Sequence, residues 1–356
     1  MRVRRSSVVF GGLGVLLIAA AVVLRFVIVP IATRLPAGTN LLVHYAGTAT
    51  LLNPRALASG DPSKALESGV PIIIDRRTRV LSTLGNVAIV SDAITLHAGA
   101  TSLPNTHLYA VNRSSLEATT APSGQKVEPA SGLTVSFPTG PKPDNSYRYY
   151  DATTELTVAV AFKGPSSSGG RGTYSYAITA NGPVKDKNLL ATLPQSLPKK
   201  TLASLAPLLP VSLRQSLAPE LATLPDPVPL TYTAKTHITA QADKTTGIAI
   251  TETLNETVTV QVSVAGKAVS LVPVLAIDAT VTPGSVRYLA GKASSAARLL
   301  FLLKSAAPLS LLILGLVSLV VAILRRRPAS PANLGSQSAP NVASAAERPD
   351  QSQEAG

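Results

Sequence analysis

The chain has 356 residues, of which 46% are hydrophobic and only 4% aromatic, and it contains no cysteine, no tryptophan and a single methionine. The lack of cysteine excludes disulfides, thiolate metal sites and a thiol nucleophile. About half of the formal net charge of +13 lies at the two ends, and the middle has no dense Lys/Arg run with interleaved aromatics, so the composition argues against nucleic-acid binding.

The first hydrophobic segment lies close to the N-terminus. Residues 8–24 are 17 consecutive apolar or small residues, and a second apolar stretch follows Arg25 up to residue 32. A bilayer core requires about 20 apolar residues, and an arginine near a helix end can extend its charge to the interface. We therefore expect residues 8–32 to form an uncleaved signal anchor after a short cytoplasmic segment, 1–7. The alternative is a cleaved signal peptide, although the run exceeds a usual signal-peptide core.

The second hydrophobic segment lies near the C-terminus. Residues 305–324 carry no charge and stop at three consecutive arginines. We expect a transmembrane helix over residues 297–324, with Lys304 extending toward the interface, and the alternative is a buried core helix. Residues 325–356 are rich in Pro, Ala, Ser and Gln, which predicts a disordered cytoplasmic tail.

Basic residues beside the two segments set the expected orientation. Basic clusters that flank transmembrane helices remain in the cytoplasm, and both outermost clusters qualify. This places both termini in the cytoplasm and residues 33–296 outside the plasma membrane, although basic residues also flank the inner ends of the spans. The residues expected at the membrane boundaries are Arg5, Arg25, Lys304, Arg325, Arg326 and Arg327.

The region between the spans is typical of a β-rich domain. Short runs rich in Val, Ile, Thr and Tyr are separated by Gly, Pro, Asn or Asp, as expected for strands. The Gly/Ser-rich segment 164–172 predicts a flexible hairpin loop, and residues 236–281 predict an antiparallel meander. The expected fold class is a mainly β antiparallel ectodomain with a short helical insert, flanked by two transmembrane α-helices. The predicted strands are 40–52, 70–75, 79–83, 88–90, 94–97, 107–111, 153–162 and 173–179.

Residues 189–224 interrupt the β pattern. Leucines recur there at helical spacing between prolines, which are tolerated in a first helical turn but not inside a helix. The pattern predicts short helices with Leu202, Leu205, Leu208 and Leu209 on one face. Two interpretations remain open: a lid over one end of the sheet, or an exposed apolar patch that contacts lipid or a partner.

The sequence offers few residues for chemistry. The four histidines have no partner at i+2 or i+4, and their positions in strands indicate surface or edge residues. The densest polar segment, residues 141–155, contains Asp144, Tyr149, Asp151 and Glu155. Its carboxylates suggest a cation site or an acid and base pair, and the alternative is a loop anchored by tyrosine packing. We predict no catalytic residue, no metal and no cofactor.

Several stretches resemble the PorA porin family of actinobacterial membrane proteins. They read LPAGTNLLVHYAGTATLLNP, VPIIIDRRTRV, HLYAVNRSSLE, GLTVSFPTGPKPDNSYRYYDATTE and DKTTGIAITETLNE. The resemblance implies a plasma-membrane or envelope location, and the family name implies a pore. None of these stretches is a catalytic motif.

Three functions follow from these expectations. The first is a non-enzymatic envelope protein that binds or transfers an apolar envelope component or supports envelope assembly. The second is a pore-forming protein, and the third is an envelope enzyme that uses the acidic cluster. The expected partners are the lipid bilayer and either an envelope lipid or other envelope proteins.

Overall fold

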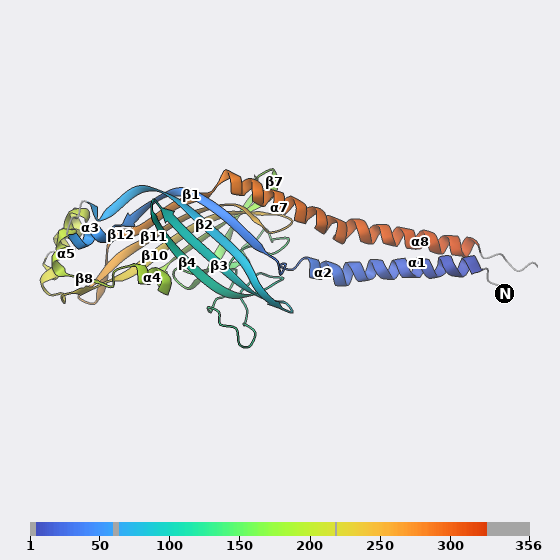
Figure 1. Cartoon of the computed structure of the whole chain (residues 1–356), viewed down its shortest axis with the longest axis horizontal. Helices are drawn as coiled ribbons and strands as arrows, with labels where there is room; N and C mark the ends of the chain where they lie inside the picture. Colours follow the sequence, from blue (N-terminus) through green and yellow to red (C-terminus); the bar gives the residue numbers. More distant parts are fainter. Residues whose placement is uncertain (1–4, 60–63, 218, 326–356) are drawn as a thin grey trace, which may run out of the picture. The chain divides into compact units, whose positions relative to one another are not determined.

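The computed structural model describes residues 5–59, 64–217 and 219–325 (Figure 1). The chain divides into two compact units, one formed by its two ends up to Ala20 and from Ser310, and one formed by residues 21–309. The predicted tail after residue 325, including Arg326 and Arg327, lies outside the described residues, as do residues 1–4.

In the first unit the helices α1 (Arg5–Val23) and α8 (Ala307–Leu324) pack through small residues. A Cβ placed on Gly14 would lie 2.7 Å from Cγ of Leu319 and 2.8 Å from the carbonyl oxygen of Gly315. The hydroxyl of Ser7 donates to the carbonyl of Ala322 at 2.6 Å. Small residues allow such close backbone approach in membrane helices, so Gly14 and Gly315 form the crossing point.

Both helices continue beyond this unit through π-helical turns. The first passes through η1 (Leu24–Ile28) into α2 (Val29–Ala32), and the second is preceded by α7 (Pro283–Phe301) and η5 (Leu302–Ala306). The helices Ser6–Ala32 and Pro283–Leu324 are long and apolar enough to span a bilayer. The second helix begins well before the expected residue 297, because Thr282 caps its start by accepting from the backbone N–H of Ser285.

A ten-stranded antiparallel sheet dominates the second unit and confirms the expected fold class. The strand order is β4-β3-β2-β1-β12-β11-β10-β7-β6-β5, so hairpins form both halves and the first and last long strands meet in the middle. The strands of this sheet are β1 (Asn40–Leu52), β2 (Leu66–Leu84), β3 (Val87–Ala98), β4 (Thr101–Asn112), β5 (Arg148–Asp151), β6 (Leu156–Ser168), β7 (Arg171–Pro183), β10 (Thr231–Asp243), β11 (Ala249–Val264) and β12 (Lys267–Val281).

The predicted Gly/Ser loop at 164–172 is wrong in extent. Strands β6 and β7 run through most of it, paired from Ser168 and Arg171 onward, and the turn consists of Gly169 and Gly170 alone. Both glycines have positive φ angles, as the type I′ turn of a two-residue hairpin requires. Loop composition therefore concealed a tight hairpin.

The segment between β4 and β5 joins the two edges of the sheet. Val111 of β4 pairs with Ala118, Glu117 pairs with Leu133, and Leu133 pairs with Tyr149 of β5. Leu133 donates to the carbonyl of Arg148 at 2.8 Å and accepts from the N–H of Tyr150 at 2.9 Å. Unpaired strand edges are prone to association, and this segment protects both of them.

Short helices cover one end of the sheet, at the left of Figure 1. Leu202 and Leu209 are buried in one apolar cluster with Val258, Val260 and Val262 of β11. We call this set of elements the cap, and it consists of α3 (Pro54–Ser59), α4 (Lys187–Thr192), β8 (Ser196–Leu197), α5 (Lys199–Ser204), η3 (Ala206–Leu208), α6 (Val211–Leu217), η4 (Glu220–Ala222) and β9 (Val228–Pro229).

Candidate functional site

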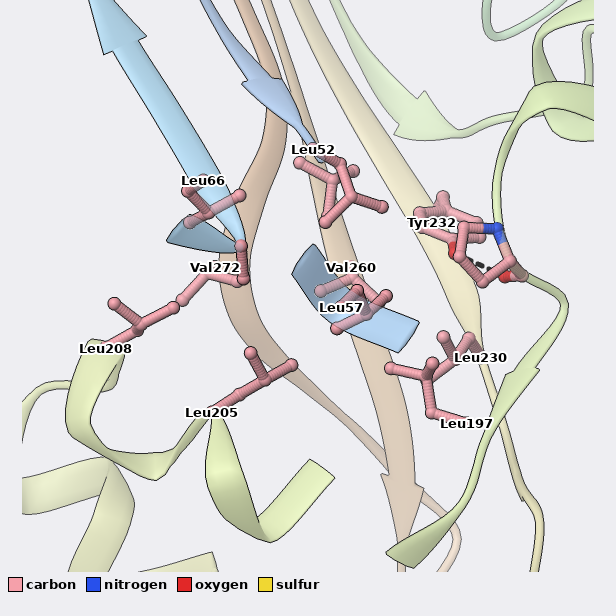
Figure 2. Close-up of a pocket in the computed structure, with 13 residues that line it drawn as sticks. Leu52, Leu57, Leu66, Leu197, Leu205, Leu208, Leu230, Tyr232, Val260 and Val272 are labelled. Atoms are coloured by element: carbon pink, nitrogen blue, oxygen red, sulfur yellow. Dashed lines mark hydrogen bonds between the residues drawn. The ribbon is translucent and has the colours of Figure 1, made fainter. Parts of the chain in front are cut away.

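An apolar pocket lies between the cap and the end of the sheet. Figure 2 shows leucines from the cap and from the ends of β1 and β2 facing valines of β11 and β12. The cavity volume is about 20 Å³, room for about one water molecule. The cap is therefore closed over this site. The lining residues are Leu52, Leu57, Ala65, Leu66, Pro194, Leu197, Leu205, Leu208, Leu230, Tyr232, Val260, Val272 and Val274.

Only one side-chain polar group belongs to the pocket lining. The hydroxyl of Tyr232 donates to the carbonyl oxygen of Pro194, so it is already paired. Burial raises the pKa of Tyr232 to about 12, which keeps the hydroxyl neutral. The pocket can therefore offer dispersion contacts and apolar burial, but no charge.

The middle of the same sheet contains a buried charged cluster. Arg76 of β2 donates from Nη2 to Asp92 of β3 at 2.8 Å and from Nε at 3.1 Å, and its Nη1 lies 3.6 Å from Glu252 of β11. Tyr45 of β1 donates to Glu252 at 3.2 Å. The strand register pairs Tyr45 with Ile74, two residues before Arg76, and alternation therefore places these side chains on one sheet face.

Electrostatics in this cluster are set by burial and by the single guanidinium. Burial alone would lower the pKa of Arg76, but the neighbouring Asp92, Tyr45 and Glu252 hold it well above its ordinary value. Burial raises the pKa of Glu252, and Arg76 opposes this shift. Burial also raises the pKa of Tyr45 and of Tyr149. Arg76 is thus the charge that compensates two carboxylates.

A second small cavity, about 30 Å³, lies beside this cluster. Its lining includes Arg76, Glu252 and Tyr149 together with Phe137 and Ser136 of the segment that joins the sheet edges. Phe137 stacks on Tyr176 with ring centroids 4.4 Å apart. Aromatic packing therefore fills most of the space next to the charges.

A separate set of polar residues lies around Glu256 of β11. Thr153 donates to its carboxylate at 2.6 Å, and burial raises the pKa of Glu256 to about 7. Thr236, which pairs with Glu256 across β10 and β11, has a buried hydroxyl without a hydrogen-bond partner among the described residues. No basic group is among the causes of the pKa shift, so the Glu256 carboxyl is partly protonated near pH 7.

The predicted polar cluster does not converge on one point. Asp144 lies in an exposed loop, where the backbone N–H and hydroxyl of Ser146 donate to it and lower its pKa. Asp151 is buried and accepts from the backbone N–H and hydroxyl of Thr154 at 3.0 and 2.6 Å. Glu155 is exposed with a positive φ of 54°, whereas Tyr149 belongs to the cavity beside Arg76.

Other sequence expectations are placed as follows. His44, His97 and His237 are exposed or half-exposed, whereas His107 is buried in β4, an outer strand of the sheet, so it is an edge residue and not a surface residue. His107 contacts Glu128 at 2.7 Å and Asp186 at 3.7 Å. Among the described residues, no group of three or more His, Cys, Asp or Glu side chains could hold a metal ion.

The boundary residues that the structure describes lie at helix ends and π turns. Arg25 belongs to η1, Lys304 belongs to η5, and Arg5 begins α1. The guanidinium of Arg325 lies over the ring of Phe10, 4.9 Å from its centroid. These positions agree with helix ends but do not establish the orientation.

Sequence reasoning did not find Arg76, Glu252 or Glu256. A signal was present in β11, where positions 250, 252, 254, 256 and 258 share a face that alternates between apolar and acidic residues. Acidic residues on the apolar face of a strand indicate a buried partner. The segments VPIIIDRRTRV and TGIAITETLNE, which carry the family resemblance, supply all three residues.

Comparison with known proteins gives the family. A sequence model described as porin PorA matches residues 6–324, nearly the whole chain. The chain belongs to the PorA porin family. PorA membership and the two candidate spans make it a membrane protein of the cell envelope.

Comparisons with individual proteins add little to the PorA assignment. No curated protein matches the chain. Among solved structures, the dehydratase domain of RzxB from Pseudomonas fluorescens is 10% identical, covers 70% of this chain and 78% of its own, and gives a TM-score of 0.11. That likeness is too weak to support any argument.

Proposed function

We propose that this protein is a non-enzymatic envelope module that binds or transfers an apolar envelope component beneath the cap. The observation that supports this proposal is the lining of the pocket, which is apolar apart from one hydroxyl that is already paired. The pocket lies at the end of β1 away from the helices, because β1 ends at Leu52 and α7 follows the other end of its neighbour β12. A bound chain would therefore lie at the end of the sheet opposite the start of α7.

The proposal requires the cap to move. Pockets that hold drug-sized ligands have volumes of about 300 Å³ or more, whereas the closed cavity has a volume of about 20 Å³. Among the described residues, no strand of the cap pairs with a strand of the large sheet, because β8 and β9 form a separate two-stranded sheet. Displacement of α5 and η3 would expose the leucines and valines to an acyl chain without breaking the main ladder.

A fluorescent fatty acid binding to the purified full-length protein in detergent tests this proposal. Leu205→Trp places a large ring in the pocket, and we expect it to reduce affinity at least tenfold. Val211→Trp is the matched control, because Val211 belongs to the cap but is 61% exposed. Wild-type protein that fails to bind the probe, or equal binding by both variants, would contradict the proposal.

The cysteine-free sequence permits a second test of cap movement. Leu205 of the cap belongs to a buried cluster against which Leu52 of β1 packs, so a Leu52→Cys/Leu205→Cys pair can be joined across the cap and the sheet by a short thiol crosslinker. We expect crosslinking to abolish probe binding and cleavage of a reducible crosslinker to restore it. Single-cysteine variants treated in the same way are the controls, and retained binding after complete crosslinking would show that the cap need not open.

The second candidate is a pore, which the family name favours. A transmembrane β-barrel carries an apolar outward band. The outward face of this sheet instead includes exposed Arg77, Lys235 and Asp278, and stacked Phe137 and Tyr176 occupy the inner face. Any pore would therefore have to form from the helices of several copies. Conductance of the purified protein in planar bilayers would support that candidate over the binding module.

The third candidate, an enzyme that uses Asp144, Asp151 and Glu155, has no geometric support. Asp144 and Asp151 each accept hydrogen bonds from their own loop, and no shared cavity joins them among the described residues.

For the orientation in the membrane, we propose that both termini are cytoplasmic and the sheet is extracytoplasmic. The basic clusters at Arg5 and at residues 325–327 support this orientation, and protease accessibility of the sheet in intact cells would test it.

A further inference from the structure

The helical segments that join the sheet to the spans carry charges of one sign. The sequence has no acidic residue before Asp61 and none between Asp278 and Glu347. None of the ion pairs found among the described residues involves a basic side chain of these segments. Within the part of the chain that the structure describes, they therefore have no carboxylate partner. The basic residues concerned are Arg25, Arg34, Arg287, Lys292, Arg298 and Lys304.

Two of these residues lie at matching depths along the spans. Arg25 follows Arg5 by 20 residues, and Lys304 precedes Arg325 by 21 residues. At a rise of about 1.5 Å per residue, each interval corresponds to roughly 30 Å, the thickness of a bilayer core. If Arg5 and Arg325 lie at one membrane surface, Arg25 and Lys304 therefore lie at the other surface, which faces the sheet.

Both helices change their winding at this depth. Arg25 belongs to the π-helical turn η1 and Lys304 to the π-helical turn η5, and the two turns contact each other. π-helical turns are rare and often occur at functional sites. Two π-helical turns at the same depth, each with a basic residue, therefore indicate a functional site rather than only the end of a span.

Exposed apolar and basic side chains alternate around the two turns. Phe26 is 72% exposed beside Arg25, Phe301 is 64% exposed before Lys304, and Arg298 is exposed one turn earlier. Aromatic rings are favoured at the level of lipid headgroups, and basic side chains there extend toward phosphates. We call Arg25, Arg298 and Lys304 the basic collar.

We propose that the basic collar binds the phosphate groups of anionic phospholipids in the leaflet next to the sheet. Arginine donates to phosphate in a bidentate manner and lysine acts as a point charge, so the three residues suit a phosphodiester headgroup. The acid-free neighbourhood supplies the charge complementarity, and the exposed phenylalanines provide contacts for the adjoining acyl chains. This site is separate from the pocket under the cap and does not depend on it.

Retention of lipid by the purified full-length protein tests the proposal. The protein in mild detergent is incubated with equal amounts of phosphatidylglycerol and phosphatidylcholine, and bound lipid is measured by native mass spectrometry. Each basic residue near an anionic surface contributes roughly a five-fold gain in affinity. We expect Arg25→Gln/Arg298→Gln/Lys304→Gln to lower the preference for phosphatidylglycerol by about 100-fold.

Matched variants separate the collar from net charge and from folding. Lys163→Gln/Lys235→Gln/Lys267→Gln removes the same charge from exposed positions of the sheet and should retain the preference. Arg25→Lys/Arg298→Lys/Lys304→Arg keeps the charge and should retain it as well. An unchanged preference in the glutamine collar variant, or an equal loss in the sheet variant, would overturn the proposal.

Discussion

The capped end of the sheet is packed with apolar side chains, whereas the middle of the same strands contains buried charged side chains. Along β11, Val258, Val260 and Val262 pack under the cap, whereas Glu252 and Glu256 lie earlier in the same strand, nearer the middle of the sheet. Apolar contacts are non-directional and can be remade around another apolar molecule. Buried charges require specific partners. The packing under the cap can therefore adapt to another apolar molecule, whereas the buried charges hold the middle of the sheet rigid.

Arg76→Met should have the largest effect on stability. It leaves Asp92 and Glu252 buried without their cation, which lowers the free energy of unfolding by about 3–5 kcal/mol. Chemical unfolding of the full-length protein in detergent measures this loss. Arg77→Met, one residue later and exposed, is the control and should change stability by no more than about 0.5 kcal/mol. Equal losses would contradict the central role of the cluster.

Leu202→Ala should act more locally. Leu202 is 2% exposed in the cap, and its truncation lowers stability by about 3 kcal/mol. We expect hydrogen exchange to accelerate over α4, α5 and α6 while β1 and β12 remain protected. Val211→Ala, at an exposed cap position, should leave exchange unchanged. Uniform acceleration through the sheet would show that the two regions unfold as one.

Glu256→Gln should change the pH dependence of stability. Burial raises the pKa of Glu256 from 4.5 to about 7, so the folded state holds a proton that the unfolded state releases. Stability from this group is complete below the unfolded pKa and falls as pH rises through about 7. Relative to Glu256→Gln, the wild type should lose about 1–3 kcal/mol between these limits. Parallel curves for the two proteins would refute the shift, and exposed Glu155→Gln should follow the wild type.

The smallest effects concern the acidic segment predicted from the sequence. Asp151→Asn weakens two hydrogen bonds from Thr154 and should lower the free energy of unfolding by about 1–2 kcal/mol. Asp144→Asn lies in an exposed loop and should leave the thermal midpoint unchanged. If either variant fails to rescue cells that lack the protein although its stability is unaffected, the enzyme hypothesis regains support.

The sequence predicted local patterns better than long-range proximity. Alternation of Val, Thr and Tyr identified β1 with its observed bounds. Leucine spacing predicted one face for four leucines, of which Leu202, Leu205 and Leu209 are buried and Leu208 is half-buried. The pairing of Arg76 with Asp92 and Glu252 depends on strand order, and Glu252 lies 176 residues from Arg76 in the sequence. No local pattern contains that contact, which explains why the charged cluster was missed.

The junction of β1 and β12 has a mechanical consequence. These strands are neighbours in the middle of the sheet, Tyr45 pairs with Val281, and each strand connects at this end to one of the two long helices. A force that separates the helices would therefore load the central ladder one hydrogen bond at a time, as in unzipping. The sheet would open between β1 and β12 while the hairpins on either side stay intact. The domain is therefore least resistant to a force that pulls the two helices apart.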